Sequence, residues 1–210
     1  MPGLPILFKG MEKYTRLYLI RHGQVAGFEK LMANGHTDVD ITETGVIQMH
    51  TLAERLRLVE LNAIYATGLI RTEKGARIIG QYHNTPIISK PEMKEIFFGD
   101  WDGISLEEIE KAYPGELDKR YADIAGYRPP GNGENMIDVS KRVLPCLKNI
   151  IIENAGKNIL LAAHGGVNRI ILCYALRMDI KNLFNIQQDY GCLNIIDYYP
   201  DNSIVRLVNG

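Results

Sequence analysis

Two histidines and two arginines follow directly after apolar, strand-like runs of the sequence. Arg21 and His22 end the run "LYLIRHGQ", Arg71 follows "NAIYATGLI", and His164 follows "NILLAA". Ligands of open α/β sheets bind at the carboxyl ends of strands. If the three runs are parallel strands, these four side chains lie close together, so the sequence predicts one site at this edge of a sheet.

The chemistry that suits this set is transfer of a phosphoryl group. An arginine guanidinium matches phosphate oxygens with a planar fork of donors. A neutral imidazole nitrogen can attack phosphorus and form a phosphohistidine. Gly165 opens an expected helix after His164, and the first N–H groups of a helix also bind anions. The protein cations could stabilise the charge that moves during transfer, so this chemistry needs no metal.

The leaving oxygen of such a reaction needs a proton. Glu95 and Asp100 in "MKEIFFGDWDG" are the candidate donors. The chain has no H-x-H or H-E-x-x-H motif and no cysteine ligand set, so we predict neither a metal site nor a cofactor.

Each motif also has a purely structural interpretation. Strands often end in a turn with Gly, and Arg71 could simply pair with Glu73 or Glu43. Asp100 could be a turn residue beside a buried tryptophan. Three further histidines have no partner pattern, and we expect them to be structural or exposed: His36, His50 and His83.

Length and composition narrow the class of protein. The 210 residues suffice for one sizeable core, and the net charge of -1 gives no general attraction to nucleic acid or anionic membranes. No run reaches the roughly 18 apolar residues of a membrane span, and the N-terminus is a poor match to a signal peptide. The three cysteines are widely spaced, as in reduced cytoplasmic proteins. We therefore expect a cytoplasmic protein whose partner is a small phosphomonoester; a homodimer is one option for its oligomeric state.

Strand and helix patterns alternate along the chain. Thr42 is the expected N-cap of the first helix, and Pro145 is expected to kink or locally break the fourth. Strands are expected at 16–20, 62–67, 86–89, 158–163, 193–199 and 203–209, and helices at 42–59, 71–83, 106–113, 136–154 and 165–178. The alternation predicts a three-layer α/β/α sandwich with a mainly parallel central sheet and a small cap at about 93–133. Residues 1–14 are expected to be a loosely ordered extension of one domain at 15–210.

Four blocks in this order resemble the histidine phosphatase superfamily, which has the phosphoglycerate-mutase-like fold: "LYLIRHGQ", "YATGLIRTEKGA", "KEIFFGDWDGISLEEI" and "LLAAHGGVNR". The resemblance implies that His22 is the phosphorylated nucleophile and that His164 contacts the phosphoryl group. Arg21 and Arg71 match the arginines that clamp the phosphate. Glu95, in preference to Asp100, matches the acid/base carboxylate. Gly165 and Asn34 are the further candidates for substrate binding.

The chain departs from the family pattern at three places. Val25 stands where the family commonly has Ser or Thr, and Phe28 where it commonly has an Asn that contributes to phosphate binding. Thr67, Gly68 and Leu69 replace the usual Ser-Pro-Leu. The first two departures question the details of the anion pocket but leave the four central residues in place.

Within this superfamily, the sequence favours a phosphatase over a mutase. A mutase resembles a longer chain, with extra basic residues after the "FG-x-W-x-G" block, whereas this block runs directly into "ISLEEIEKAY". "FFGDWDG", "GNGEN" and "NIQQDYGCLNIIDY" resemble the α-ribazole phosphatases, which implies dephosphorylation of α-ribazole 5′-phosphate in cobalamin synthesis. The alternatives are a phosphoglycerate mutase, a broad-specificity sugar-phosphate phosphatase, and a non-catalytic regulatory module that binds an anion.

Overall fold

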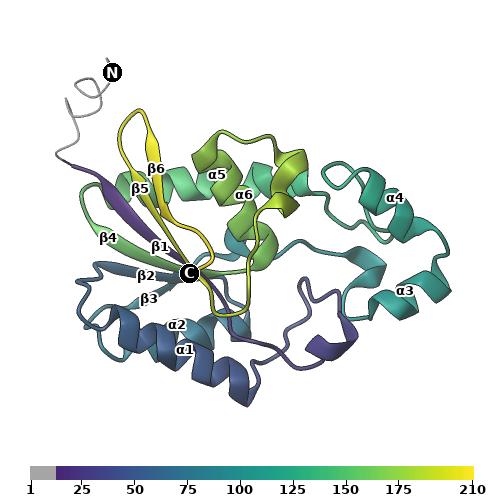
Figure 1. The fold of residues 1–210 in the computed structure, drawn as a ribbon, viewed down its shortest axis with the longest axis horizontal. Helices are drawn as coiled ribbons and strands as arrows, with labels where there is room; N and C mark the ends of the chain where they lie inside the picture. Colours follow the sequence, from purple (N-terminus) through teal and green to yellow (C-terminus); the bar gives the residue numbers. More distant parts are fainter. Residues whose placement is uncertain (1–12) are drawn as a thin grey trace.

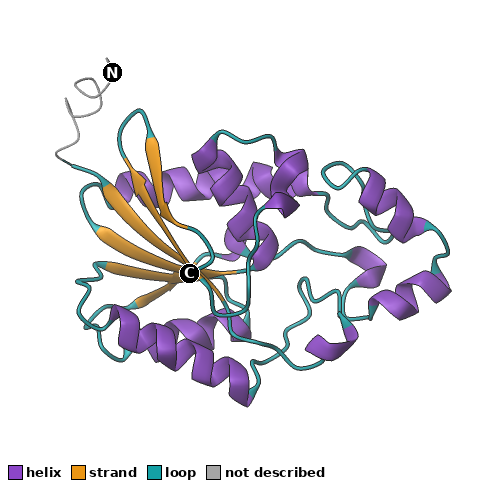
Figure 2. Cartoon of the chain, viewed as in Figure 1, coloured by secondary structure: helices purple, strands orange, loops and turns teal. Residues whose placement is uncertain are grey.

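A six-stranded sheet forms the centre of the computed structural model, which describes residues 13–210 (Figures 1 and 2). The strand order is β3-β2-β4-β1-β5-β6. The strands are β1 (Thr15–Arg21), β2 (Ala63–Ala66), β3 (Ile87–Ser89), β4 (Asn158–Ala163), β5 (Leu193–Tyr198) and β6 (Ser203–Leu207). Strands β3, β2, β4 and β1 run parallel, while β5 is antiparallel to both β1 and β6. The mainly parallel sheet and the final hairpin are therefore as predicted.

Helices cover both faces of this sheet (Figure 1). The helices α1 (Glu43–Leu56) and α2 (Ile70–Gly80) lie on one face, and α5 (Met136–Glu153) and α6 (Gly165–Leu176) on the other. Side chains of β1 alternate between the two cores: Leu17 and Leu19 face α5 and α6, while Tyr18 and Ile20 face α1 and α2. The expected three-layer α/β/α sandwich is confirmed.

Side-chain caps mark where three helices begin. The hydroxyl of Thr42 accepts a hydrogen bond from the Gly45 N–H at 3.1 Å, so the predicted N-cap of α1 is confirmed. Ser105 forms a capping box at the start of α3 (Leu106–Ala112), and Asn135 forms one at the start of α5.

The helix α5 continues through Pro145, so of the kink or local break that the sequence predicts, the break does not occur. Proline removes one backbone hydrogen bond from a helix interior. Buried residues on both sides of Pro145 hold the helix against the sheet: Met136, Val139, Val143, Leu147 and Ile150. Packing along this whole face outweighs the loss of one bond, because tertiary contacts supply most of a helix's stability.

The short helices α3 and α4 (Glu116–Ala122) form the predicted cap and extend beyond the sheet (Figure 1). The cap has a small core of its own around Trp101, which is 1% exposed. The Trp101 ring stacks on Tyr127 with centroids 5.6 Å apart. This core lets the cap hold a shape beside the sheet.

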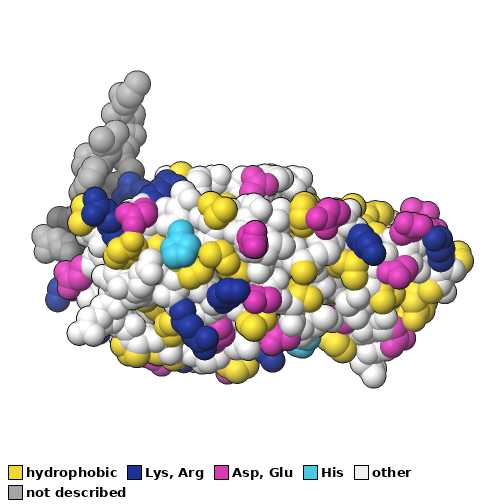
Figure 3. Space-filling model, turned by 90° about the horizontal axis from the view of Figure 1, so that it is seen from below, with side chains coloured by type: hydrophobic (Ala, Val, Ile, Leu, Met, Phe, Trp, Pro, Cys, Tyr) yellow, Lys and Arg dark blue, Asp and Glu magenta, His cyan; other side chains and the backbone are white. Residues whose placement is uncertain are grey.

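The predicted N-terminal extension, 1–14, lies outside the described residues except for its last two. Of these, Tyr14 packs its ring against Tyr199, with centroids 5.3 Å apart. Between residues 13 and 210, no helix is both long and apolar enough to cross a bilayer. Acidic and basic side chains are interspersed over the face seen in Figure 3.

Candidate active site

The ends of β1 and β4 bring the two histidines together. These strands are parallel neighbours, and Arg21 pairs in register with Ala163. The next residues, His22 and His164, therefore leave the sheet side by side, with ring centroids 5.3 Å apart. Arg71, from the first turn of α2, donates from Nε to Nδ1 of His164 at 3.3 Å. All four residues predicted from strand ends thus meet at one edge of the sheet.

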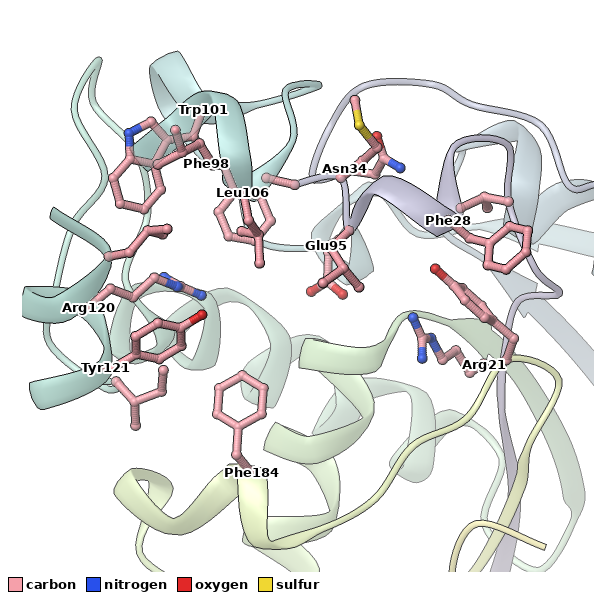
Figure 4. Close-up of a pocket in the computed structure, with 18 of the residues that line it drawn as sticks. Arg21, Phe28, Asn34, Glu95, Phe98, Trp101, Leu106, Arg120, Tyr121 and Phe184 are labelled. Carbon is pink, nitrogen blue, oxygen red and sulfur yellow. The ribbon is translucent and has the colours of Figure 1, made fainter. Parts of the chain in front are cut away.

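A cavity of about 630 Å³ opens between this edge and the cap (Figure 4). Arg21, His22, Asn34 and Glu95 line it, and most of the other lining side chains are apolar or aromatic. Arg71 and His164 do not line it: they are 1% and 0% exposed and lie behind His22.

His22 is held as a neutral imidazole with one free nitrogen. Its Nδ1 lies 2.8 Å from the carbonyl oxygen of Gly23, which can only accept, so the proton is on Nδ1. Burial lowers the pKa of His22 well below its ordinary value, and the charges of Arg21 and Arg71 lower it further. Nε2 makes no hydrogen bond within residues 13–210 and keeps its lone pair at the cavity, as a nucleophile requires.

A chain of hydroxyl groups fixes the tautomer of His164. Because Nδ1 accepts from Arg71, Nε2 carries the proton and donates to the Thr67 hydroxyl at 2.9 Å. That hydroxyl bonds to Thr72 at 2.9 Å, which donates to the carbonyl of Leu69. Burial, followed by the charge of Arg71, lowers the pKa of His164 well below its ordinary value. Thr67, one of the departures from the family pattern, therefore still supports the second histidine.

Arg21 presents most of its donors to the site. Only Nη1 has a protein partner within the described chain, the carbonyl of Gln188 at 2.6 Å. Nε is buried without a partner, and the guanidinium lies over the Tyr190 ring, 3.9 Å from its centroid. Unfilled donors on a half-buried cation are what an anion-binding residue offers.

Arg71 is in contrast almost fully occupied by the protein. Besides bonding His164, its Nη1 donates to the carbonyl of Thr37 at 2.8 Å. Its Nη2 donates to the carbonyls of Asn34 and Gly35. One of its five N–H groups is left, so Arg71 holds the loop at 34–37 and contributes mainly its positive charge to the site.

Glu95 projects into the cavity from the loop that precedes α3 (Figure 4). Its carboxylate accepts from the N–H groups of Gly166 and Ile96, both at 3.0 Å. Gly166 is in the first turn of α6, where the helix dipole favours a negative charge. Asp100, the other candidate acid, is exposed and does not line the cavity.

Two glycines at the start of α6 make room for these side chains. A Cβ on Gly166 would lie 2.5 Å from a Glu95 oxygen. A Cβ on Gly165 would lie 3.1 Å from Nη1 of Arg169 and 3.4 Å from Nε of Arg21. The His-Gly-Gly motif therefore lets an acid and a cation approach the same helix terminus.

The remaining sequence candidates also have defined places. Asn34 lines the cavity with its side chain and bonds Arg71 through its carbonyl. Val25 and Phe28 also line the cavity. At these two positions the cavity wall is apolar, where the family commonly has polar side chains. His36 has the expected structural role: its Nε2 donates to the backbone carbonyl of Glu95 at 3.0 Å.

Sequence reasoning missed several residues that shape the site. Tyr190 and Gln188 belong to the stretch "NIQQDYGCLNIIDY". This stretch indicated a resemblance to a family, but not that the two residues contact Arg21. Arg120 lines the cavity from α4. Nothing in the pattern around Arg120 singles it out, because it follows another basic residue on a short helix.

The arrangement can bind an oxyanion at Arg21, attack it with the free nitrogen of His22, and supply a proton from Glu95. Within residues 13–210, no group of three or more His, Cys, Asp or Glu side chains is arranged to hold a metal ion.

The family model of the histidine phosphatase superfamily (branch 1) matches residues 17–210. The adenosylcobalamin/alpha-ribazole phosphatase of Salmonella typhimurium is 26% identical over 199 residues, covering 92% of this chain and 96% of that protein. Phosphoserine phosphatase 1 of Hydrogenobacter thermophilus is 24% identical, covering 93% of this chain and 92% of the relative.

Among solved structures, the alpha-ribazole phosphatase from Shigella flexneri has a TM-score of 0.84 at 26% identity, covering 93% of this chain and 96% of its own. The fold, the motif order and the match over nearly all described residues agree. The chain belongs to the histidine phosphatase superfamily, branch 1, and is a phosphatase.

Proposed function

We propose that the protein hydrolyses phosphomonoesters through a phosphohistidine on His22 and without a metal ion. The observation that carries this is the free Nε2 of a neutral, buried imidazole beside the unfilled donors of Arg21. Arg21 binds the phosphoryl oxygens. Arg71 and His164 stand behind the nucleophile and supply charge and orientation.

The reaction proceeds in two transfers. The lone pair of His22 Nε2 attacks phosphorus, and the bond from phosphorus to the ester oxygen breaks. Glu95 gives its proton to the leaving oxygen, so an alcohol departs. A water molecule then gives a proton back to Glu95 and attacks the phosphohistidine, which releases inorganic phosphate and restores neutral His22.

The substrate that we propose is α-ribazole 5′-phosphate, in the assembly of the cobalamin nucleotide loop. Support comes from the names of the Salmonella and Shigella relatives and from the cavity itself. Its aromatic lining suits a leaving group with a flat ring: Phe28, Phe98, Trp101, Tyr121, Phe184 and Tyr190. We place the reaction in the cytoplasm, which suits the three free cysteines.

Trapping of the phosphoenzyme tests the mechanism. Denaturing quench with ³²P-labelled substrate should leave label that survives alkali and is lost in acid. The His22→Ala variant should carry no label and have no measurable turnover. Full turnover in that variant would refute the mechanism.

A substrate comparison tests the specific reaction. The ratio kcat/KM for α-ribazole 5′-phosphate should exceed the values for 3-phosphoglycerate and sugar phosphates by at least about tenfold, or roughly 1.4 kcal/mol in barrier. Similar values for all of them would instead indicate a broad-specificity phosphatase. Transfer of label between phosphoglycerates would indicate a mutase.

A further inference from the structure

Arg120 is a cation that the reaction described above does not use. It extends from the cap helix α4 into the cavity, and Figure 4 shows its guanidinium across the cavity from Arg21, with Glu95 between them. Its neighbours in the cavity wall are mainly apolar or aromatic, among them Leu117 and Tyr121.

The charge of Arg120 is not neutralised by the protein. Within residues 13–210 it forms no ion pair, and its Nη1 is buried with no hydrogen-bond partner. One face of the guanidinium lies over Phe98, 5.2 Å from the ring centroid. Burial lowers its pKa, and the carboxylate of Glu95 is already bonded to Gly166 and Ile96.

The neighbouring cation on α4 is exposed and paired, in contrast to Arg120. Lys119, one residue earlier, pairs with Glu116 at 2.6 Å, and its side chain is 67% exposed. A solvent-facing cation of this kind needs no further explanation. A cation turned inward with an empty donor leaves a favourable interaction unmade, which a bound acceptor would complete.

We propose that Arg120 is a specificity-determining residue, which donates to an acceptor oxygen on the leaving group of the substrate while Arg21 holds the phosphate. The inference rests on the proposed function, because it takes the phosphate to lie at Arg21 and His22. The preferred substrates are thus phosphomonoesters with acceptor oxygens beyond the ester bond. Ribose oxygens and a carboxylate are two sources of that chemistry.

Binding on the inactive His22→Ala background tests this contact without turnover. Three ligands are compared: α-ribazole 5′-phosphate, with ribose oxygens; O-phosphoserine, with a carboxylate; and phenyl phosphate, with no acceptor outside its phosphate ester. Adding Arg120→Met keeps a long apolar side chain and removes the donors. Lys119→Met is the matched control, since it removes a cation from the same helix.

We expect Arg120→Met to raise the Kd of at least one acceptor-bearing ligand by about tenfold to a hundredfold, and to leave phenyl phosphate within about threefold. The larger loss identifies ribose oxygens or a carboxylate as the partner. Arg120→Lys should recover part of the affinity, and Lys119→Met should change nothing. An equal loss for all three ligands, or no loss for any, would overturn the proposal.

The same variants with His22 intact separate this inference from the proposed function. If the mechanism fails, the wild type carries no alkali-stable label, although Arg120→Met can still alter the Kd values. If only the inference fails, the label forms normally and the order of substrates is the same with and without Arg120. Thermal unfolding of each variant verifies that it is folded.

Discussion

At the scale of single residues, two arginines that look equivalent in the sequence have different tasks. Both follow a strand and both match phosphate-clamping positions. Within residues 13–210, most N–H donors of Arg21 have no protein partner. Four of the five N–H groups of Arg71 instead donate to carbonyls and to His164. The difference comes from the loop at 34–37, whose carbonyls surround Arg71. The types and spacing of the residues do not predict that these carbonyls contact Arg71.

The proton donor can be tested at the same scale through the leaving group. Glu95→Gln keeps the shape but cannot donate a carboxylic proton, so it should slow an alkyl phosphate by about a hundredfold or more. p-Nitrophenyl phosphate should slow far less, since its leaving group departs without a proton. Measuring kcat for both substrates gives the answer; equal losses would remove Glu95 from the donor role.

Gly166→Ala should likewise slow an alkyl phosphate far more than p-nitrophenyl phosphate. The new Cβ would lie 2.5 Å from a Glu95 oxygen and force that carboxylate away. Gly156→Ala is the matched control, because no atom lies within 4 Å of its added Cβ, although its positive φ gives it a cost in stability alone. An unchanged ratio of the two kcat values in Gly166→Ala would show that Glu95 does not depend on this contact.

At the scale of elements, the sequence predicted the sheet and the main helices because their burial is periodic. Leu17 and Leu19 alternate with Tyr18 and Ile20, which identifies β1 as a strand buried on both faces. Parallel strands then bring His22 and His164 to one edge. The cap follows other rules: its short helices surround one tryptophan, and the direction of Arg120 depends on that packing. The cap was therefore predicted as a segment, but its contribution to the site was not.

A side chain of helix α5 fixes the loop that carries Glu95, the proposed acid. Arg142 pairs with Glu134 through two bonds of 2.7 and 2.8 Å. It also donates to the backbone carbonyls of Glu92, Lys94 and Glu95. All five of its N–H groups are thereby used, three of them on carbonyls of the loop that carries Glu95.

Arg142→Met should release this loop and leave Glu134 unpaired. We expect the free energy of unfolding to fall by about 2–4 kcal/mol. We also expect kcat to fall more for alkyl phosphates than for p-nitrophenyl phosphate. Urea denaturation and the two assays measure these effects. The neighbouring Lys141→Met, whose side chain is 70% exposed, should change stability by less than about 0.5 kcal/mol. Equal effects of the two variants would contradict a positioning role.

At the scale of the whole molecule, the site lies where the two cores and the cap meet. Building it there buries two imidazoles and the guanidinium of Arg71, which water would otherwise solvate. The fold tolerates this because both histidines stay neutral and because carbonyls satisfy most donors of Arg71. The burial that keeps His22, the proposed nucleophile, neutral therefore also makes stability depend on pH.

The direction of that dependence follows from the lowered pKa values of the two site histidines, and the lowered pKa values of His36 and His83 act in the same direction. An unfolded histidine takes up a proton near pH 6.5, whereas burial and the neighbouring arginines keep folded His22 and His164 neutral well below that pH. Below pH 6.5 the unfolded state therefore binds more protons. Stability is complete above pH 6.5 and is lost as the pH falls toward the folded pKa, by about 1.4 kcal/mol per histidine between pH 7.5 and 5.5.

Urea unfolding at pH 7.5, 6.5 and 5.5 tests this dependence. His22→Gln removes one of the four histidines whose pKa values are lowered, which are His22, His36, His83 and His164. It should therefore lessen the loss of stability on acidification by about 1.4 kcal/mol relative to the wild type. His50→Gln, at an exposed position of α1, should not lessen it to that extent. Carboxylates with lowered pKa values, such as Asp102 and Asp197, titrate in a more acidic range than this window. A wild-type loss that His22→Gln leaves unchanged would mean that His22 is not held neutral by the fold, and its role as a ready nucleophile at neutral pH would then need another source.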